Sequence, residues 1–517
     1  MSSTGTDLLL PDGARPAEVL DALSDRLPLR EGAATHRDRR FYDTFDGLLR
    51  AAGLAFVHEA DRSALVSLHG ASERASMEAA HPPERVLAGE LEPGPLRDDL
   101  TEIIEVRALL PLVRIDSAQR AFGVLDAGEK TVVRLALEAS AVVASPNRRL
   151  ALAPRIRLTP IRGYDQEFER VRATLIDDIG LRVADRSEVD EAVIATGATP
   201  GGISARVEVA LAPDERADVA VASILRRLAE VMDANLPGTI ADIDPEFLHD
   251  YRVAVRRSRA VMRELKRVFP PEQLARFRIE LRWLQHITGP ARDLDVYVLD
   301  FDQLRSGLPE PAYSDLEPLL RVLRDRRVVA HREMVWALRS ERAADLRAQW
   351  PAFLRELIIL PAEDRPDATR PIGELSGERI VKVYRRMVKM GSAIDDASPA
   401  ESLHELRKQG KELRYLLELF GVPLHPGDVV KPLVRALKSL QDTLGRHQDR
   451  EVQILTLRSF RDDVATLPGG PAALMAMGVL LERLGEDERS ARAEFSESFA
   501  SFASSEQRAL VRETFGT

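Results

Sequence analysis

Three features are scarce in this 517-residue sequence, and each absence excludes a class of protein. There is no cysteine, which excludes disulfide-stapled folds and thiolate metal sites. Aromatic residues make up 5% of the chain, and the basic helices lack an array of rings that could stack on bases. No run approaches the roughly 18 apolar residues of a membrane span, and the start of the chain lacks the basic segment of a signal peptide. We therefore expect a cytoplasmic protein without a membrane partner.

Positive charge is in deficit over the whole chain. The 83 acidic residues outnumber the 73 Lys and Arg, and the formal net charge is −10. This balance argues against indiscriminate binding to nucleic acid or anionic membranes, so an anion site has to be a local concentration of cations. The length and the 44% hydrophobic content favour two or three globular domains.

The sequence changes character near residue 200, where TGATPGG predicts a linker at 196–205. Before it, residues 1–200 contain runs that alternate apolar and polar residues, as antiparallel strands require. These runs are GLAFVHEA, SALVSLHG, RAFGVLDAG, TVVRLALEASAVVA and RIRLTPIRG, followed by one helix, YDQEFERVRATLIDDIG. After the linker, residues 206–517 are helical in pattern. The predicted fold class is multidomain α+β, with a β-rich domain followed by an all-α domain.

The helical half repeats itself at a fixed spacing. One pair of similar segments is HDYRVAVRRSR and HELRKQGKELR, which start at His249 and His404. A second pair, LQHITGPARD and LQDTLGRHQD, starts at Leu284 and Leu440. Offsets of 155 and 156 residues indicate a duplicated unit. We expect the copies, about 206–360 and 361–517, to pack as related helix bundles.

The segment that starts at His249 and its copy that starts at His404 each predict a helix with a stripe of cations along one face. No acids are interleaved in either stripe. Glu264 lies outside the stripe, and an apolar face lies opposite. The first stripe comprises His249, Arg252, Arg256, Arg259 and Arg263; the second comprises His404, Arg407, Lys411 and Arg414. Arg282 and Lys438, each three residues before a repeated glutamine, add one cation per copy. Weaker candidates are Lys382, Arg386, Lys389, Lys431 and Arg435.

A solvated charged surface is the ordinary explanation of such a helix, but ordinary surfaces mix charges of both signs. Repetition of like charges in two copies favours a site for a polyvalent anion. Zinc is the weaker alternative, because these helices carry no HxxxH or HExxH pair, and we predict no metal. We expect Gly289 and Gly445 to end helices, and Asp293 and Asp449 to cap the helices that follow.

These blocks resemble the signature sequences of CHAD domains over roughly residues 210–515. The resemblance implies an all-helical fold of two four-helix bundles related by a pseudo-twofold axis. Members of this family are implicated in binding inorganic polyphosphate through a basic surface or pore between the bundles. The resemblance therefore implies the same ligand here, bound by the two stripes. Lys411 stands where the first copy has Arg, which keeps the charge but loses the planar fork.

The first half resembles a CYTH domain, the usual partner of CHAD in one chain. The resemblance rests on RRFYDTFDGLLRAAGLAF, RIDSAQRAFGVLDAGEKTVVRLALE and IRGYDQEFERVRATLIDDIGL. It implies a triphosphate-tunnel β-barrel whose ExExK strand holds a divalent metal through its carboxylates. That motif is missing, since TDLLLPDG stands near the expected first strand. Metal-assisted hydrolysis needs such carboxylates, so we predict a degenerate, catalytically silent domain.

Together these patterns predict a protein without enzymatic activity or cofactor that binds inorganic polyphosphate and is carried to polyphosphate granules. Arg pairs bidentately with phosphate oxygens, and Lys supplies a point charge. Two rival functions stay open at this point. One is metal-dependent triphosphatase activity in the first domain. The other is nucleic-acid binding by the basic helices, although they carry no groove-reading motif.

Overall fold

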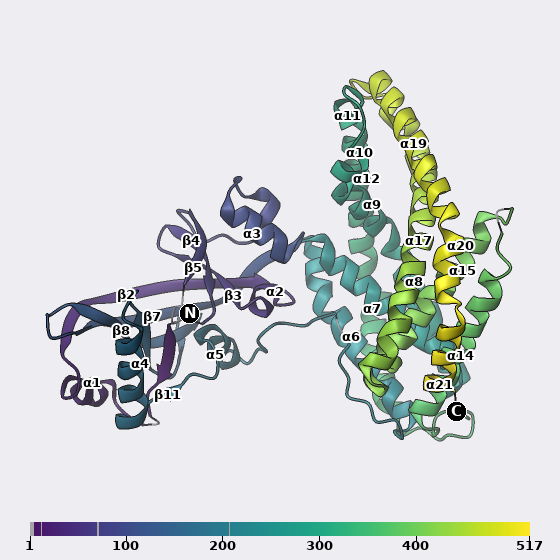
Figure 1. Cartoon of the computed structure of the whole chain (residues 1–517). Coiled ribbons are helices and arrows are strands. Elements are labelled where there is room, and N and C mark those ends of the chain that lie inside the picture. The colour runs from purple at the N-terminus through teal and green to yellow at the C-terminus, as the bar shows by residue number, and fades with distance from the viewer. Residues whose placement is uncertain (1–4, 12, 70–71, 206, 396, 517) are drawn as a thin grey trace. The chain divides into compact units, whose positions relative to one another are not determined.

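The computed structural model describes residues 5–11, 13–69, 72–205, 207–395 and 397–516. The chain divides into two compact units, the strand unit Met1–Ser204 and the helical unit Ala205–Thr517 (Figure 1). The first is built on an antiparallel sheet and the second consists of helices, so the predicted α+β class is confirmed. Within the described ranges, no helix is both long enough and apolar enough to cross a bilayer.

The strand unit contains one antiparallel sheet whose order is β11-β1-β10-β8-β7-β2-β3-β4-β5, with β6 beside β7 and β9 beside β8. All the predicted strands are present. The strands are β1 Thr6–Leu9, β2 Leu29–Thr44, β3 Leu54–Glu59, β4 Arg62–Ser67, β5 Glu73–Glu78, β6 Val86–Leu87, β7 Ala108–Leu125, β8 Thr131–Ser145, β9 Arg148–Ala151, β10 Arg155–Pro160 and β11 Arg182–Val183. The helices are α1 Pro16–Ser24, α2 Leu48–Ala51, α3 Pro95–Ile104, α4 Asp165–Ala173 with a π-turn at Thr174–Asp178, and α5 Glu188–Ala195.

The expected closed barrel is wrong, because the sheet is open. Among the described residues, no pairing joins its two edge strands, β5 and β11. The edge strand β11 has only two residues, and the chain after it forms helix α5 rather than a further strand. A short edge strand followed by a helix cannot supply the ladder that closure requires.

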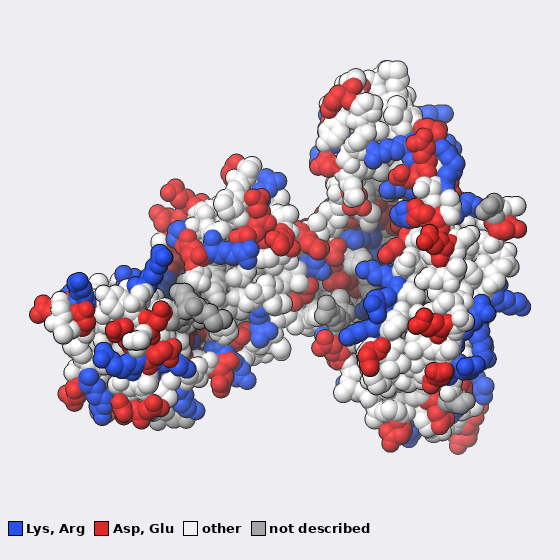
Figure 2. All heavy atoms as spheres, viewed as in Figure 1, with Lys and Arg blue, Asp and Glu red and all other residues white. Residues whose placement is uncertain are grey.

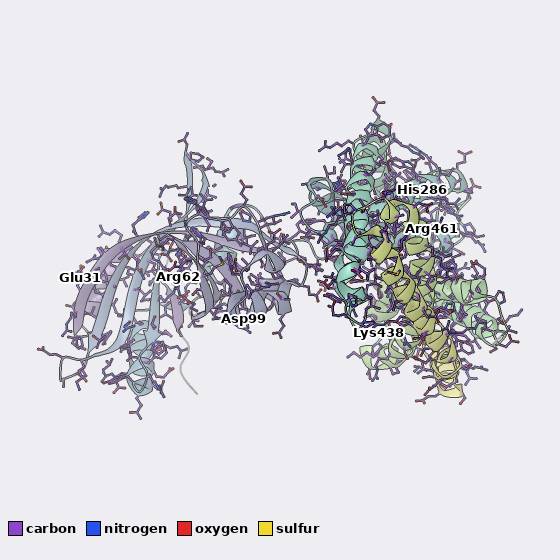
Figure 3. All side chains as sticks on the ribbon, turned by 90° about the horizontal axis from the view of Figure 1, so that it is seen from above. Glu31, Arg62, Asp99, His286, Lys438 and Arg461 are labelled. Carbon is purple, nitrogen blue, oxygen red and sulfur yellow. The ribbon has the colours of Figure 1, made fainter. Side chains whose placement is uncertain are left out.

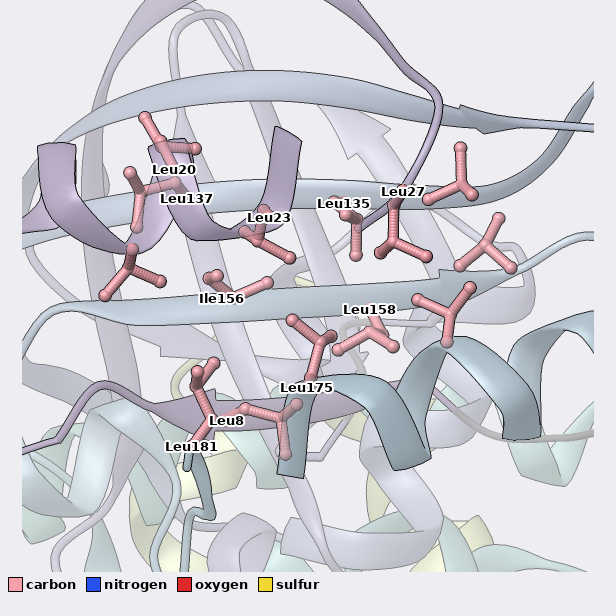
Figure 4. Close-up of a cluster of buried hydrophobic side chains, with 14 of the residues drawn as sticks. Leu8, Leu20, Leu23, Leu27, Leu135, Leu137, Ile156, Leu158, Leu175 and Leu181 are labelled. Atoms are coloured by element: carbon pink, nitrogen blue, oxygen red, sulfur yellow. The ribbon is translucent and has the colours of Figure 1, made fainter. Parts of the chain in front are cut away.

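The two faces of the sheet differ because strand side chains alternate between them. One face is apolar and is covered by α1 and α4, as the side chains of Leu8, Leu20, Leu158 and Leu175 show (Figure 4). The opposite face is covered by α5 and combines an apolar cluster with buried charged side chains. Those charged groups lie at alternate positions of β2, β8 and β10 and at the start of α5.

The helical unit preserves the repeat in its helix boundaries. The helices are α6 Ala217–Ala241, α7 Pro245–Glu264, α8 Pro271–Ile287, α9 Gly289–Leu299, α10 Phe301–Arg305, α11 Ala312–Asp315, α12 Glu317–Leu338, α13 Glu341–Glu356, α14 Ile372–Gly391, α15 Ala400–Leu416, α16 Val422–Leu424, α17 Gly427–Ser459, α18 Arg461–Ala465, α19 Gly470–Ala493, α20 Phe495–Phe502 and α21 Ser505–Phe515. The helices α6, α7 and α8 begin 155, 155 and 156 residues before α14, α15 and α17. Duplicated helices therefore occupy matching places along the chain.

The predicted helix breaks at the two repeated glycines are only partly right. The first copy does break, since α8 ends at Ile287 and α9 begins at Gly289. In the second copy α17 continues through Gly445 without interruption. Asp293 and Asp449 lie inside α9 and α17, so neither is a cap. Glycine lowers helix propensity by about 1 kcal/mol, which the packing of a 33-residue helix overcomes.

Candidate anion-binding site

The two stripe-bearing helices lie against each other. The first, α7, starts at a capped end, where the Asp244 carboxylate accepts hydrogen bonds from the amides of Glu246 and Phe247. Its partner α15 continues into a π-turn, Leu417–Gly421. Both helices bury their apolar faces, as the amphipathic pattern predicts.

Two ion pairs cross between these helices. The guanidinium of Arg257 lies 2.6 Å from the Glu418 carboxylate, and that of Arg263 lies 2.8 Å from the Glu412 carboxylate. At the repeat offset of 155 residues, Arg257 corresponds to Glu412 and Arg263 corresponds to Glu418. A twofold relation between the helices requires this reciprocity, in which each contact recurs with the copies exchanged. The two members of each equivalent position carry opposite charges, so both contacts are attractive.

Next to the paired residues Arg257 and Glu412 stand two equivalent cations, Arg256 on α7 and Lys411 on α15. Neither is within salt-bridge distance of a carboxylate in the part of the chain that the structure describes, and the buried Nε of Arg256 has no hydrogen-bond partner. Burial lowers the pKa of Lys411 to about 8, and the charges of Arg407 and Arg256 act in the same direction. The charged form of Lys411 is therefore disfavoured first by burial and then by the cations around it.

A groove of about 530 Å³ opens beside Lys411, between α15 and α17. Three further predicted cations, Arg407, Arg414 and Lys438, line it. Figure 2 shows Lys and Arg side chains gathered over the region of α7, α8 and α17, and Figure 3 labels Lys438 on α17. The remaining lining residues are Glu418, Val434, Gln441, Asp442, Gly445, Arg446 and Asp449. The groove therefore joins cations from two helices of the second copy.

The expectation of a stripe free of acids is wrong in part. Arg407 donates a hydrogen bond to Asp449 at 2.8 Å, and Arg414 lies 3.5 Å from Glu418. Arg263 contacts its own neighbour, Glu264, at 3.2 Å, in addition to Glu412. Asp449 comes from a neighbouring helix, and Glu264 reaches Arg263 through a side chain that bends back, so a projection of one helix does not reveal either contact. Glu418 follows Arg414 by four residues on the same helical run, so the sequence did carry a signal for that contact. Lys411, Lys438, Arg256 and Arg282 have no salt bridge among the described residues.

In the first copy, more of the predicted cations are bound by neighbouring groups of the protein than in the second copy. Arg252 is buried and donates from Nη1 to the backbone oxygen of Gln285 at 2.9 Å and to the Thr288 hydroxyl at 2.8 Å. Burial lowers the pKa of Arg252 to about 10. Arg259 donates to the side-chain oxygen of Gln285, and burial, with Arg282 and Arg263 nearby, lowers its pKa. Such contacts leave less of these guanidinium groups available to a ligand.

The residues of the second copy that correspond to Thr288 and Gln285 do not bind its cations in the same way. Thr288 corresponds to Leu444, which offers no oxygen, so Arg407 turns to Asp449 instead. Gln285 corresponds to Gln441, whose amide nitrogen and oxygen are buried without a hydrogen-bond partner. An unsatisfied buried amide costs about 1–3 kcal/mol, which a ligand with acceptor oxygens could recover in part.

Both predicted histidines lie at the start of their helices, beside carboxylates. Potential metal-ligand atoms lie within 4.8 Å of one another in two groups, Glu246, His249 and Asp250, and Glu401, His404 and Glu405. His404 Nδ1 contacts the side-chain oxygen of Gln448, and Glu405 pairs with Lys408 at 2.5 Å. Acids in the first turn also stabilise the positive end of a helix, so these clusters have an ordinary structural role.

The five weaker candidates do not line the groove. Among the described residues, Lys382 and Lys389 are exposed on α14, and Arg386 donates to the side chain of Gln409 at 2.9 Å. Lys431 and Arg435 are exposed on α17. Sequence reasoning missed Arg446, which lines the groove and pairs with Glu494. Its equivalent in the first copy is Pro290, so the repeat carried no signal for it.

The helical architecture and the paired basic helices agree with comparison to known families. Residues 223–458 match the family model of the CHAD domain, a range that contains every predicted anion-site residue. This chain therefore contains a CHAD domain at 223–458, which confirms that part of the resemblance. The matched range is narrower than the 210–515 expected, and none of the comparisons names a CYTH domain.

The individual relatives are partial matches. Two uncharacterized proteins from two strains of Mycobacterium tuberculosis are each 30% identical over 217 residues, which is 40% of this chain and 38% of the relative. The match thus spans well under half the length of these relatives. Among solved structures, the CHAD domain from the plant Ricinus communis is 26% identical, covers 57% of this chain and 95% of that chain, and has a TM-score of 0.47. PptA from Streptomyces chartreusis is 19% identical over 55% of this chain and 99% of that chain, with a TM-score of 0.42.

Proposed function

We propose that the CHAD domain binds inorganic polyphosphate without chemical change, in the groove between α15 and α17 and across the adjacent Arg256. The observation that carries this proposal concerns Arg256 and Lys411, which come from the two copies. Neither has a carboxylate partner among the described residues, and Lys411 lines an open groove. Bound phosphate would relieve their mutual repulsion and raise the pKa of Lys411.

A linear polyanion fits this arrangement better than a single phosphate. The unpaired cations lie on α7, α15 and α17 rather than in one enclosed pocket, so a chain of phosphates can neutralise them in succession. Asp449 and Asp442 also line the groove, and their negative charges repel a compact, highly charged anion placed beside them. We further propose that the strand unit is not a metal-dependent triphosphatase, and that binding carries the protein to polyphosphate granules in the cytoplasm.

The test is a charge reversal with a matched control. The triple variant Arg256→Glu, Lys411→Glu and Lys438→Glu should bind long polyphosphate at least about 100-fold more weakly in a fluorescence anisotropy titration, about 2.7 kcal/mol. Its control, Lys382→Glu, Lys389→Glu and Lys431→Glu, changes the net charge equally at exposed positions outside the groove. Equal losses in the two variants would mean that binding follows overall charge, and the proposed groove would be wrong.

Two further measurements test the electrostatic mechanism and then separate polyphosphate from nucleic acid. The logarithm of the association constant should fall linearly with the logarithm of salt concentration, because bound cations release counterions from the polymer. Long polyphosphate should also displace single-stranded RNA and duplex DNA when all are supplied at equal charge. Preference for either nucleic acid would contradict the proposal.

A further inference from the structure

The strand unit contains a cavity of about 350 Å³ on the face of the sheet that α5 covers. This volume lies at the lower end of the range for small-molecule sites, about 300–1,000 Å³. One wall is apolar and comprises Phe41, Ala55, Val57, Ala64, Val66, Leu68 and Val189. The other wall comes mainly from charged residues of β2, β3, β4 and β10, with Arg62 of β4 labelled in Figure 3. The cavity is therefore amphipathic.

Positive and negative charges balance in the lining. The cations are Arg37, Arg39, Arg62 and Arg157, and the anions are Glu59, Asp61, Glu73 and Glu188. Every one of these arginines already has a carboxylate partner. A polyanion would have to break several of these pairs, and removing one partner of a buried pair costs about 3–5 kcal/mol. The lining thus disfavours triphosphate, in contrast to the groove of the helical unit.

The inner pairs are the most firmly held. Arg157 contacts Asp7 at 2.8 Å and Glu138 at 3.4 Å, and both are well shielded from solvent. Arg39 lies 3.1 Å from Glu188, and both side chains are almost fully buried. A serine hydroxyl, that of Ser140, donates to Glu188 at 2.7 Å. A ligand cannot displace these contacts without exposing buried charge.

One polar group on this wall is nevertheless unsatisfied. Arg39 is 5% exposed, and its Nε has no hydrogen-bond acceptor. Two positions along β2, on the same face, Arg37 is 30% exposed and is held by Glu59 of the neighbouring strand. Together, Arg39 and Arg37 offer donors for one further acceptor group next to the apolar wall. Guanidinium groups pair especially well with carboxylates.

We propose that this cavity binds a small organic monocarboxylate with an apolar body. The carboxylate lies between Arg37 and Arg39, and the body packs against Val57, Val66 and Val189. A single carboxylate needs only the unpartnered donor of Arg39 and breaks none of the existing ion pairs, and an apolar body gains from leaving water. This site is separate from the polyphosphate groove, and neither proposal depends on the other.

The first test compares carboxylates with their uncharged amides on the full chain. Hexanoate, octanoate and phenylacetate are titrated calorimetrically, each alongside its primary amide. At least one carboxylate should bind with one-to-one stoichiometry, and its amide should bind at least about tenfold more weakly, or about 1.4 kcal/mol. Equal binding of acid and amide, or no binding by any of the three acids, overturns the proposal.

The second test locates the site. Val66→Phe fills the cavity from β4 with a residue that strands accommodate, so carboxylate binding should be lost. Val183→Phe, on exposed β11 outside the cavity, is the matched control and should bind normally. Arg39→Gln is a second variant that should weaken binding by at least about tenfold, and a folded Arg39→Gln protein with unchanged affinity contradicts the anchor.

The third test uses tripolyphosphate as a competitor. It should fail to displace the bound carboxylate from the full chain. Displacement that persists in the triple groove variant would mean that a polyanion enters this cavity, and the charge argument would be wrong. Loss of polyphosphate binding in that variant leaves the carboxylate result unchanged, so the two proposals fail separately.

Discussion

The cavity of the strand unit and the groove of the helical unit are both lined by basic side chains, but they differ in how many of these side chains form ion pairs. In the cavity each arginine is paired with a carboxylate. In the groove Lys411 and Lys438 have no such partner among the described residues, although Arg407 and Arg414 do. We therefore expect the surplus of cations over neighbouring acids, rather than the number of cations, to decide where a polyanion binds.

Solvent access explains part of the difference. A buried charge is unstable without a partner, since burial removes the hydration that stabilises it. The interior arginines of the strand unit, Arg39, Arg155 and Arg157, accordingly meet Glu188, Glu191 and Asp7. Exposed Lys438 keeps its hydration, so an unpaired state costs little there. Lys411 is partly buried and also unpaired, and the cost appears as its lowered pKa. The four predictions below test this contrast, from the largest expected effect to the smallest.

Removing a buried carboxylate should have the largest effect. Glu188→Leu leaves Arg39 without its carboxylate partner and should lower the free energy of unfolding of the strand unit by about 3–5 kcal/mol. Hydrogen exchange of β2 and β7 would report it. The control Glu73→Leu breaks the more exposed pair with Arg62 and should cost less than about 1 kcal/mol. Equal costs would remove the distinction between buried and exposed pairs.

Reversing one charge between α7 and α15 should have an intermediate effect. Arg257→Glu places two carboxylates together, beside Glu418, and should cost about 1–3 kcal/mol in urea unfolding of the helical unit. Tryptophan fluorescence suits this measurement because Trp283, Trp336 and Trp350 all lie in that unit. The exchanged double variant, Arg257→Glu with Glu418→Arg, should recover most of the loss. Failure to recover would mean that the pair is not a direct attraction.

Neutralising a groove acid should strengthen binding modestly. Asp449→Asn releases Arg407 from its carboxylate and should raise polyphosphate affinity about threefold, or about 0.6 kcal/mol. Asp462→Asn removes the same charge at an exposed residue of α18 outside the groove and serves as the control. An equal gain in both variants would indicate a general charge effect.

The smallest effect concerns pH. The pKa of Lys411 is lowered to about 8 in the free protein, and a bound polyanion raises it, so binding takes up protons above pH 8. Affinity should therefore decline further across pH 8–10 in the native protein than in Lys411→Arg, which restores the residue of the first copy and stays charged. Without ligand, the lowered pKa makes the stability of the native protein rise as pH increases from about 8 toward 10.5. Identical pH profiles would exclude Lys411 from the site.

The repeat and the helical unit were predicted correctly, because each depends on spacing within one segment; the cations of the stripes remain a prediction. The sequence did not predict the acids that meet those cations. Glu412 and Glu418 approach α7 only because two helices pack with reciprocal contacts, and a projection of one helix carries no information about its neighbour. Burial, partly offset by Arg263, raises the pKa of Glu412 to about 7, another effect of packing.

The strand unit shows a different limit of sequence reasoning. Strand β2, Leu29–Thr44, was not among the predicted strands, although it pairs along most of its length with β7. Its first half, LREGAATHR, shows no alternation of apolar and polar residues, because that part of the strand is mainly exposed. Binary patterning identifies a strand only where one face is apolar. The open sheet was missed for a related reason, since closure depends on pairing between distant edges.

The reciprocal contacts between α7 and α15 have a consequence for assembly. Two first-copy helices docked in the same way would bring Arg257 against Arg263, and two second-copy helices would bring Glu412 against Glu418. Only unlike copies attract, and the peptide linkage between them gives the correct pairing a high effective concentration. The opposite charges at equivalent positions thus favour contact between the two halves of one chain over contact between two identical copies.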